Sequence, residues 1–255
     1  MRCVGIIPVR MASVRFPGKP LAPILGVSML EHVYQRSRLC RRLDEVVVAT
    51  CDDDIRAAAE TFGARVVMTS HRHERAAERV AEAAAAIETD VVVLIQGDEP
   101  LVQPQMLEEL LTPLEEDPAL QCTNLMMLVG EEDARDPDQI KVVCDRARNA
   151  LYMSREPVPS PQRGAVTQWG RQVGLIAFRK AFLLQLMALS PTPLEQAESV
   201  DMLRALEHGF PVRMVTTRHH THPVDTPADV AIVETLMQAD QWLASYAALG
   251  QARHG

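Results

Sequence analysis

The sequence has little of several things that would place it in a special class of proteins. Its five cysteines are scattered and form no C-x-x-C pair, so neither a disulfide framework nor a zinc knuckle is indicated. No apolar run approaches the length of a membrane span. The first residues have the pattern of a strand rather than that of a signal peptide. These absences predict a cytoplasmic protein with no membrane partner.

Positive charge is also in short supply. The 255 residues carry a formal net charge of −8, which argues against a general nucleic-acid binder because affinity for duplex phosphates rests on clustered Lys and Arg. Apolar content is 47% and charged content 24%, both ordinary for a globular protein. A chain of this length forms one large domain or two small ones and can bury a substantial core.

The most distinctive stretch runs from Gly5 to Leu21, with the sequence GIIPVRMASVRFPGKPL. A short apolar strand, Val4 to Ile7, leads into a loop of small and cationic residues. The loop residues that we single out are Arg10, Ser13, Arg15, Gly18 and Lys19. Backbone N–H groups and cations in such a loop form a seat for phosphates. Pro20 after the Gly-Lys pair excludes a Walker A loop, and the alternative is a polar surface loop with solvated cations.

Strands and helices alternate through the first half of the chain. We expect strands at 4–7, 45–50, 65–69 and 90–95. One helix is expected to begin near Ser28, and three more to cover 55–62, 76–87 and 104–114. This rhythm predicts right-handed βαβ crossovers and a mostly parallel sheet.

The rhythm changes after about residue 121. Strands are predicted at 122–128, 140–144, 150–154, 172–178 and 212–216, and helices at 181–189, 195–207 and 227 to about 249. Few helices separate the first four of these strands, which indicates a mixed or antiparallel section and makes it the candidate dimer surface. The Pro-rich stretch 157–164 is the best candidate for a mobile loop.

Two aspartates lie at the borders of predicted elements. Asp98 belongs to the Q-G-D-E-P segment after strand 90–95, at the sheet edge where open α/β proteins bind ligands. Asp225 precedes the closing helix in V-D-T-P. If these loops meet, two carboxylates and the cationic loop would suit Mg²⁺ and a triphosphate. The alternatives are a plain turn at Asp98 and a helix cap at Asp225.

Seven blocks of the chain resemble the CMP-Kdo synthetase (3-deoxy-manno-octulosonate cytidylyltransferase) family over nearly the whole length. The blocks are IIPVRMASVRFPGKPL, VVVATCDDDI, VVVLIQGDEP, ALYMSREPVP, GRQVGLIAFRKAFL, SPTPLEQAESVDMLRALEHG and VDTPADV. They occur in the order of the family and at close to its spacing, so the resemblance is highly specific for fold and reaction type.

The resemblance implies a Rossmann-like nucleotide-diphospho-sugar transferase fold, with a mostly parallel sheet and a mixed or antiparallel second section. It implies a single domain over 1–255, divided into a nucleotide-binding half (1–120), an acceptor-binding and dimerisation half (121–226) and a C-terminal helix (227–255). The enzyme would use CTP and Mg²⁺, usually as a homodimer. It would move CMP onto an anionic acceptor by attack on the α-phosphorus, with release of pyrophosphate.

Roles for individual residues follow from the matching motifs. The residues implied to bind the nucleotide are Arg10, Ser13, Arg15, Lys19 and Gln96. Those implied to act in catalysis are Lys19, Arg10 and Asp98, and those implied to hold magnesium are Asp98 and Asp225. The positions expected at the acceptor are Arg75, Arg79, Gln172, Glu198 and Asp201.

The chain departs from the family mainly at the acceptor positions. Arg75-Ala76-Ala77 replaces Ser-Gly-Thr, Gln172 replaces a His, and Asp201-Met202 replaces Glu-Gln. A site built for hydroxyl groups discriminates strongly, and Arg75 adds a cation suited to carboxylate or phosphonate oxygens. We therefore hypothesise a small phosphonate acid such as phosphonoformate as acceptor, as in phosphonate antibiotic biosynthesis. The alternative is drift within a family that acts on 3-deoxy-manno-octulosonate for lipopolysaccharide biosynthesis.

Two other classes of function stay open. A sugar-1-phosphate nucleotidyltransferase using UTP or GTP would also fit the G-K-P loop, although Q-G-D-E-P and V-D-T-P favour cytidine. A non-catalytic nucleotide-binding paralogue is disfavoured by the retained Lys19, Asp98 and Asp225. The histidines between His219 and His222 lack the spacing of a helical metal pair, so a surface loop is favoured over a zinc site.

Overall fold

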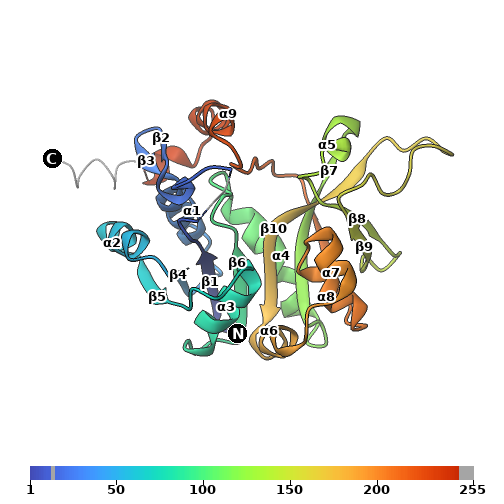
Figure 1. Ribbon diagram of the computed structural model, residues 1–255, viewed down its shortest axis with the longest axis horizontal. Helices are drawn as coiled ribbons and strands as arrows, with labels where there is room; N and C mark the ends of the chain where they lie inside the picture. The colour runs from blue at the N-terminus through green and yellow to red at the C-terminus, as the bar shows by residue number, and fades with distance from the viewer. Residues whose placement is uncertain (13–14, 247–255) are drawn as a thin grey trace.

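The computed structural model describes residues 1–12 and 15–246 of the chain (Figure 1). A nine-stranded sheet runs through the molecule, and seven of its strands follow one path in the order β11-β7-β10-β6-β1-β4-β5. In that order they are β11 (Arg213–Thr217), β7 (Cys122–Val129), β10 (Trp169–Arg179), β6 (Val91–Ile95), β1 (Cys3–Pro8), β4 (Glu45–Thr50) and β5 (Arg65–Met68).

The N-terminal part of the sheet is parallel. Strand β1 pairs in parallel with both β4 and β6, and β4 pairs in parallel with β5. Strands β1 and β6 are buried along their whole length, as expected for apolar strands covered by helices on both faces. The predicted parallel α/β half is confirmed.

The second part of the sheet is mixed. Strand β10 runs antiparallel to both β6 and β7, whereas β11 runs parallel to β7. Strands β8 (Lys141–Cys144) and β9 (Ala150–Ser154) form an antiparallel pair that joins the sheet through β10. The loop between β9 and β10 extends away from the body of the molecule (Figure 1). The predicted mixed section is therefore confirmed.

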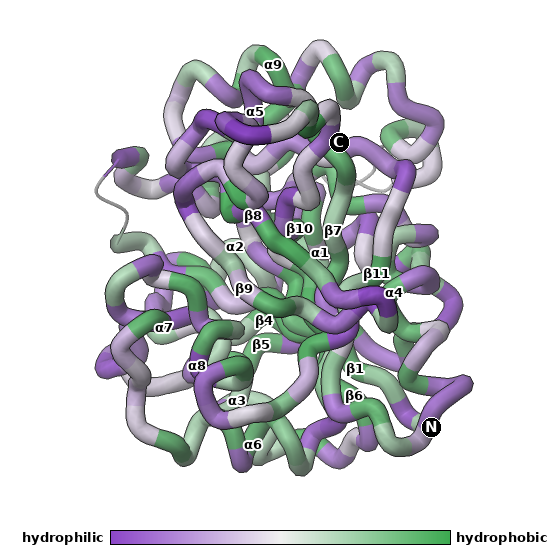
Figure 2. The backbone as a smooth tube through the Cα atoms, turned by 90° about the vertical axis from the view of Figure 1, so that its right-hand side faces the viewer, coloured by the Kyte–Doolittle hydropathy of each residue, from purple (hydrophilic) through white to green (hydrophobic). Residues whose placement is uncertain are grey.

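Helices cover both faces of the sheet because the side chains of each strand alternate between them. One core contains Ile7 of β1 and the inner faces of α1 (Met29–Arg38), α2 (Asp53–Thr61) and α4 (Pro104–Glu116). The other contains Ile6 and the inner faces of α3 (Ala76–Ala85), α6 (Lys180–Ala188) and α8 (Met202–Glu207). Hydrophobic residues concentrate along strands such as β6 and β7 (Figure 2).

A third, smaller core lies under the C-terminal segment. It joins the short hairpin of β2 (Pro23–Ile24) and β3 (Val27–Ser28) to α9 (Pro227–Gln238). The remaining elements are the 3₁₀ turn η1 (Lys19–Leu21), α5 (Glu131–Arg135) and α7 (Pro193–Glu198). None of the helices in the described part of the chain is long and apolar enough to cross a membrane.

Two helix predictions are wrong. The helix expected over 195–207 is split into α7 and α8 at Ser199, which has a left-handed φ of 55°. The split brings Glu195 of α7 against Arg204 of α8, and both hydrogen bonds of this buried ion pair measure 2.7 Å. A paired buried charge avoids the desolvation cost that a single one would carry.

The closing helix, expected from 227 to about 249, ends at Gln238. Residues 239–242 form a turn, in which Asp240 accepts a hydrogen bond from the fully buried Arg36 at 2.5 Å. The turn thus gives this buried guanidinium a carboxylate partner that it would otherwise lack. A short helical turn follows at 243–246, and residues 247–255 lie outside the described residues.

A buried histidine ties the C-terminal segment to α1. His32 contacts the carbonyl oxygen of Ile24 through Nε2 and the hydroxyl of Tyr246 through Nδ1, both at 2.8 Å. Because a carbonyl oxygen only accepts, Nε2 carries the proton and Nδ1 accepts from the tyrosine. Burial lowers the pKa of His32 from 6.5 to about 4.

This histidine should make stability depend on pH. The unfolded chain takes up a proton near pH 6.5, whereas folded His32 does so near pH 4, so its stabilising effect is lost as the pH falls through this range. The loss should be on the order of 2 kcal/mol by pH 5. Urea unfolding of the wild type and His32→Gln at pH 7 and pH 5 measures it. Equal pH dependence in both proteins would contradict the assignment.

Candidate active site

A cleft opens at the carboxyl ends of β1 and β6, the edge at which open α/β sheets bind ligands. It has two adjoining lobes with volumes of about 380 and 700 Å³. Both lobes share one group of lining residues: Arg10, Glu74, Arg75, Ala76, Gln96 and Asp98. Segments that follow β1 and β6 and the segment that leads into α3 therefore meet at one place, as the Q-G-D-E-P motif predicted.

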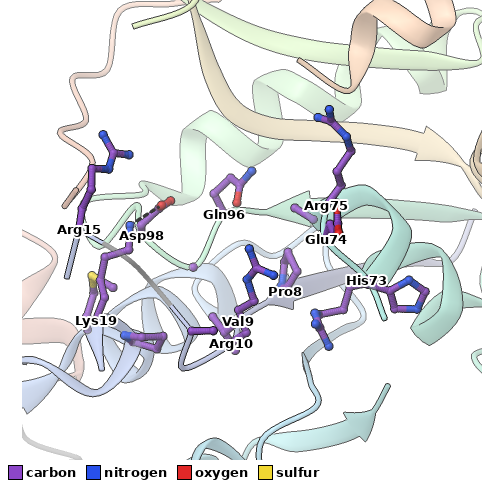
Figure 3. A pocket seen from close by; sticks show the side chains of 16 residues that line it. Pro8, Val9, Arg10, Arg15, Lys19, His73, Glu74, Arg75, Gln96 and Asp98 are labelled. Atoms are coloured by element: carbon purple, nitrogen blue, oxygen red, sulfur yellow. Dashed lines mark hydrogen bonds and ion pairs between the residues drawn. The ribbon is translucent and has the colours of Figure 1, made fainter. Parts of the chain in front are cut away.

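The smaller lobe is rich in cations (Figure 3). Its Lys and Arg residues are Arg10, Arg15, Lys19, Arg75 and Arg79. Only two carboxylates, those of Glu74 and Asp98, line the same lobe. Such a concentration of positive charge in an acidic protein attracts a small polyanion. Ser13, the remaining residue predicted at the phosphates, lies outside the described residues.

Lys19 is the centre of the polar network. Gly18 has a φ of 74°, a conformation that favours glycine, and it starts the 3₁₀ turn that carries Lys19. The Lys19 ammonium donates to Asp98 Oδ2 and to the carbonyl oxygen of Val224, both at 2.8 Å. It lies 3.5 Å from Asp225 Oδ1. The cationic loop and the two predicted aspartates therefore converge on one point.

Asp225 reaches this point because the chain before α9 crosses the cleft. The amide of Val224 donates to the carbonyl oxygen of Asp98 at 2.9 Å, which joins the two aspartate segments through their backbones. The cap of α9 is Thr226, in a capping box with Asp229. The alternative reading of Asp225 as the helix cap is therefore wrong, and its carboxylate faces the cleft.

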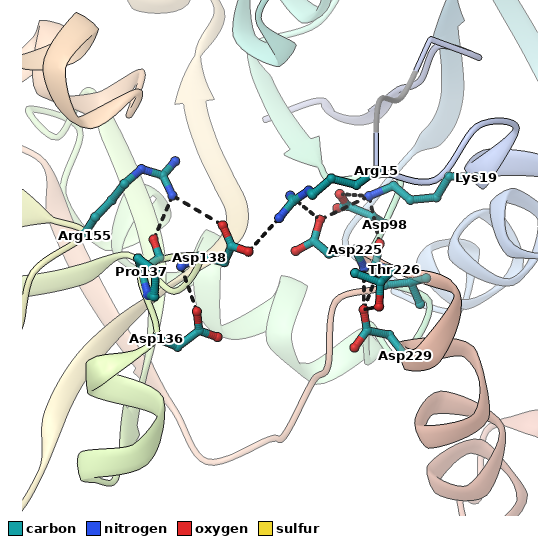
Figure 4. A network of polar contacts seen from close by, with 11 residues as sticks. Arg15, Lys19, Asp98, Asp136, Pro137, Asp138, Arg155, Asp225, Thr226 and Asp229 are labelled. Atoms are coloured by element: carbon teal, nitrogen blue, oxygen red, sulfur yellow. Dashed lines mark hydrogen bonds and ion pairs between the residues drawn. The ribbon is translucent and has the colours of Figure 1, made fainter.

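Arg15 bridges two acidic segments (Figure 4). Its guanidinium contacts Asp138 Oδ2 at 2.6 Å and Asp225 Oδ1 at 2.8 Å. Sequence reasoning missed Asp138, which lines the larger lobe. A signal was present in the D-P-D-Q segment just before β8, where aspartates precede a strand that leads to the cleft.

The larger lobe contains a buried cation that was also missed. Arg171 is 5% exposed, donates to Gln139 Oε1 at 2.9 Å and has no hydrogen-bond partner at Nε. Among the described residues it forms no ion pair within 4.0 Å. Its alternation with Gln172 along β10 could have indicated which of the two is buried. A buried guanidinium without a carboxylate partner suits an anionic ligand.

Glu99, next to Asp98, is buried and lines the larger lobe. Burial raises the pKa of this carboxyl to about 7, although a hydrogen bond from the Thr221 hydroxyl opposes the shift. The turn that follows β6 therefore places a carboxyl of unusual pKa against the cleft. Perturbed acids of this kind are common at functional sites.

Arg75 is not the free cation that its sequence context suggested. Its guanidinium lies 2.8 Å from Asp201 Oδ1 and 3.4 Å from Glu195 Oε1. Asp201 also accepts a long hydrogen bond, 3.4 Å, from the amide of Ala77 in the first turn of α3. Burial raises the pKa of Asp201, and Arg75 opposes that shift. Two of the predicted acceptor residues thus neutralise each other.

The other three predicted acceptor residues lie in different places. Arg79 lines the smaller lobe and has an unpartnered Nη2, and Gln172 lines the larger lobe and donates to Asn124 Oδ1 at 2.6 Å. Glu198 lines neither lobe. Its carboxylate instead accepts hydrogen bonds from Tyr152 and Ser154 of β9 and from the amide of Arg155.

The histidine loop engages separate carboxylates. His219 Nε2 lies 3.6 Å from Glu109, and His222 Nε2 lies 3.4 Å from Asp229. Within residues 1–12 and 15–246 there is no group of three or more His, Cys, Asp and Glu side chains that could hold a metal. Asp98 and Asp225 are two carboxylates, so a cation between them would need further oxygen ligands from a substrate.

A cationic cleft at the end of a mostly parallel sheet defines an α/β enzyme that handles nucleotides. A cytidylyltransferase family model matches residues 4–216. The chain is 46% identical to the 3-deoxy-manno-octulosonate cytidylyltransferase of Myxococcus xanthus over 241 residues, which cover 93% of this chain and 97% of that protein. The enzyme of the same name from Syntrophotalea carbinolica is 43% identical over 244 residues, with 92% and 98% covered.

A solved structure shows the same likeness. The CMP:2-keto-3-deoxy-manno-octonic acid synthetase complexed with CTP superposes with a TM-score of 0.89 and is 36% identical. The match covers 94% of this chain and 99% of that one. The chain therefore belongs to the CMP-Kdo synthetase family of cytidylyltransferases and is a nucleotidyltransferase. The resemblance that the seven sequence blocks indicated is confirmed.

Gly174 provides a test of how the cleft holds Gln96. A Cβ atom at Gly174 would lie 2.4 Å from Gln96 Cγ, so Gly174→Ala should push this side chain out of place and weaken nucleotide binding. Overpacking of this kind costs about 1–3 kcal/mol of stability. Gly130→Ala is the matched control, because no heavy atom lies within 4 Å of its Cβ and its φ is −78°. Thermal unfolding and CTP titration should separate the two variants, and identical behaviour would contradict this packing.

Proposed function

We propose that this chain transfers CMP from CTP to 3-deoxy-manno-octulosonate and releases pyrophosphate. An oxygen of the acceptor forms the new bond to the α-phosphorus while the bond between that phosphorus and the bridging oxygen breaks. The acceptor hydroxyl loses its proton to solvent, and the pyrophosphate leaves with the bonding electrons. Such a transfer depends on positioning and charge neutralisation rather than on a nucleophilic side chain.

The convergence of Lys19, Asp98 and Asp225 is the observation that supports this proposal most. The cationic lobe with Arg10, Arg15 and Lys19 is suited to the triphosphate, and Gln96 lies beside it on the cleft wall. A ligand that spans both lobes would bring its phosphates to the two aspartates, since Asp98 lines both lobes. Catalysis is therefore assigned to Arg10, Lys19 and Asp98.

We propose that Asp98 and Asp225 hold Mg²⁺ together with oxygens of the nucleotide. The donor set fits this ion, which is commonly bound through one or two carboxylates plus substrate phosphates. When bound, the metal would supply charge neutralisation at the phosphates. In the free protein Lys19 takes this position between the carboxylates, at 2.8 Å from Asp98 and 3.5 Å from Asp225.

The larger lobe is proposed to take the acceptor. The relatives named above favour 3-deoxy-manno-octulosonate over a phosphonate acid. Arg75, on which the phosphonate hypothesis depended, is already paired with Asp201 and Glu195. Arg171 is the better candidate for the acceptor carboxylate, because it is buried, lines this lobe and has no carboxylate within 4.0 Å among the described residues, although Glu99 lies near enough to feel its charge. A homodimer remains a prediction.

The acceptor is tested by measuring pyrophosphate release. With CTP and Mg²⁺, 3-deoxy-manno-octulosonate should support turnover at a kcat/KM at least about 10²-fold above that of phosphonoformate, because buried polar groups reject a ligand that leaves them unpaired. Faster turnover of phosphonoformate would overturn the acceptor assignment and restore the phosphonate reading. Parallel assays with UTP and GTP distinguish the other nucleotidyltransferase class.

The aspartates are tested by removing their charge. Asp98→Asn and Asp225→Asn should each lower kcat by at least about 10²-fold, since metal-assisted charge stabilisation is worth several kcal/mol. Glu60→Gln, at an exposed position in the last turn of α2 that lines neither lobe, should leave kcat unchanged. Circular dichroism checks that each variant is folded. Full activity in either cleft variant would remove that residue from the mechanism.

A further inference from the structure

Asp138 lies on a segment that the structure holds firmly at the mouth of the larger lobe. The ammonium of Lys141, whose residue is fully buried, donates to the carbonyl oxygens of Asp136 and Gln139 at 2.7 and 2.6 Å, and to that of Arg155. The amide of Asp138 donates to Asp136 Oδ1 at 2.8 Å. The backbone of residues 136–139 is thus anchored, and the Asp138 carboxylate extends from it to Arg15.

That carboxylate lies between two arginines from different parts of the chain (Figure 4). Arg15 contacts Asp138 Oδ2 at 2.6 Å, and Arg155 Nη1 lies 4.0 Å from Asp138 Oδ1. Arg155 is held by two other bonds, to the carbonyl oxygens of Pro137 at 2.8 Å and Glu198 at 2.7 Å. A second cation is therefore already present beside Asp138 if Arg15 leaves.

Arg15 lines the smaller, cationic lobe, yet its guanidinium is already bound to two carboxylates of the protein. The guanidinium cannot bind the oxygens of a triphosphate while it stays bound to both Asp138 and Asp225. The Arg15 side chain is 51% exposed and that of Asp138 is 52% exposed, so the contact between these two is weak and can be exchanged. A polyphosphate, with more charge than a single carboxylate, is a stronger partner for Arg15.

We propose that Asp138 is a positioning residue that competes with the nucleotide phosphates for Arg15. In the free enzyme it draws Arg15 across the cleft mouth. When CTP binds, Arg15 exchanges Asp138 for phosphate oxygens, and Asp138 turns to Arg155. Affinity for CTP is thereby reduced by the cost of breaking the Arg15–Asp138 contact. The same holds for any ligand whose site includes a side chain that is already bound to another group of the protein. This inference rests on the proposed nucleotide site and is independent of the acceptor.

Binding of CTP without divalent metal tests the competition. Isothermal titration should show that Asp138→Asn binds CTP about threefold more tightly than the wild type, the size expected for one exposed ion pair. Arg15→Ala should bind CTP more weakly. In the Arg15→Ala background, the further change Asp138→Asn should leave the affinity for CTP unchanged, because the arginine for which Asp138 competes is absent.

Asp133→Asn is the matched control for charge alone, since Asp133 is an exposed carboxylate on the neighbouring helix α5. It should leave the CTP affinity unchanged. Weaker or unchanged binding in Asp138→Asn would overturn the proposal, and so would tighter binding that persists in Arg15→Ala, which would indicate a general field effect. If the wild type failed to bind CTP with or without Mg²⁺, the proposed nucleotide site would be contradicted, and so would the competition for Arg15 that rests on it.

Discussion

A single lysine ammonium, placed between two carboxylates from distant parts of the chain, is the interaction on which the cleft depends. Lys19 lies 79 residues from Asp98 and 206 from Asp225, yet all three meet within 3.5 Å. Without this cation, two carboxylates facing one cleft would repel each other in the absence of a metal. The lysine therefore holds the two aspartates together at one place in the cleft.

The sheet explains why such distant segments meet. Parallel strands β1 and β6 end at the same edge, so the loops that carry Lys19 and Asp98 leave the sheet side by side. The chain then returns across this edge before α9, and Val224 hydrogen-bonds to the backbone of Asp98. Buried polar contacts of α1 with Asp240 and Tyr246 hold the segment that follows α9. The fold thus brings the segments that carry Lys19, Asp98 and Asp225 together through backbone geometry.

Much of this could be predicted from sequence. Strand and helix periodicity predicted the parallel half, and the motif around Lys19 predicted the cationic loop. Local signals marked Asp138, in D-P-D-Q, and Arg171, on β10, but not their partners, because Arg15 and Gln139 lie far away in the chain. Arg75 was misjudged for the same reason, since its partner Asp201 is 126 residues away. The break at Ser199 accompanies the buried Glu195–Arg204 pair, a contact between two helices that local helix propensity does not include.

We expect Lys19 to give up its carboxylate partners when nucleotide and metal bind. A crystal structure with CTP and Mn²⁺, in which the anomalous signal locates the metal, tests this most directly. The metal should be bound by Asp98 and Asp225, with the Lys19 ammonium on phosphate oxygens. A structure in which Lys19 still lies between the two aspartates while CTP is bound elsewhere would contradict it.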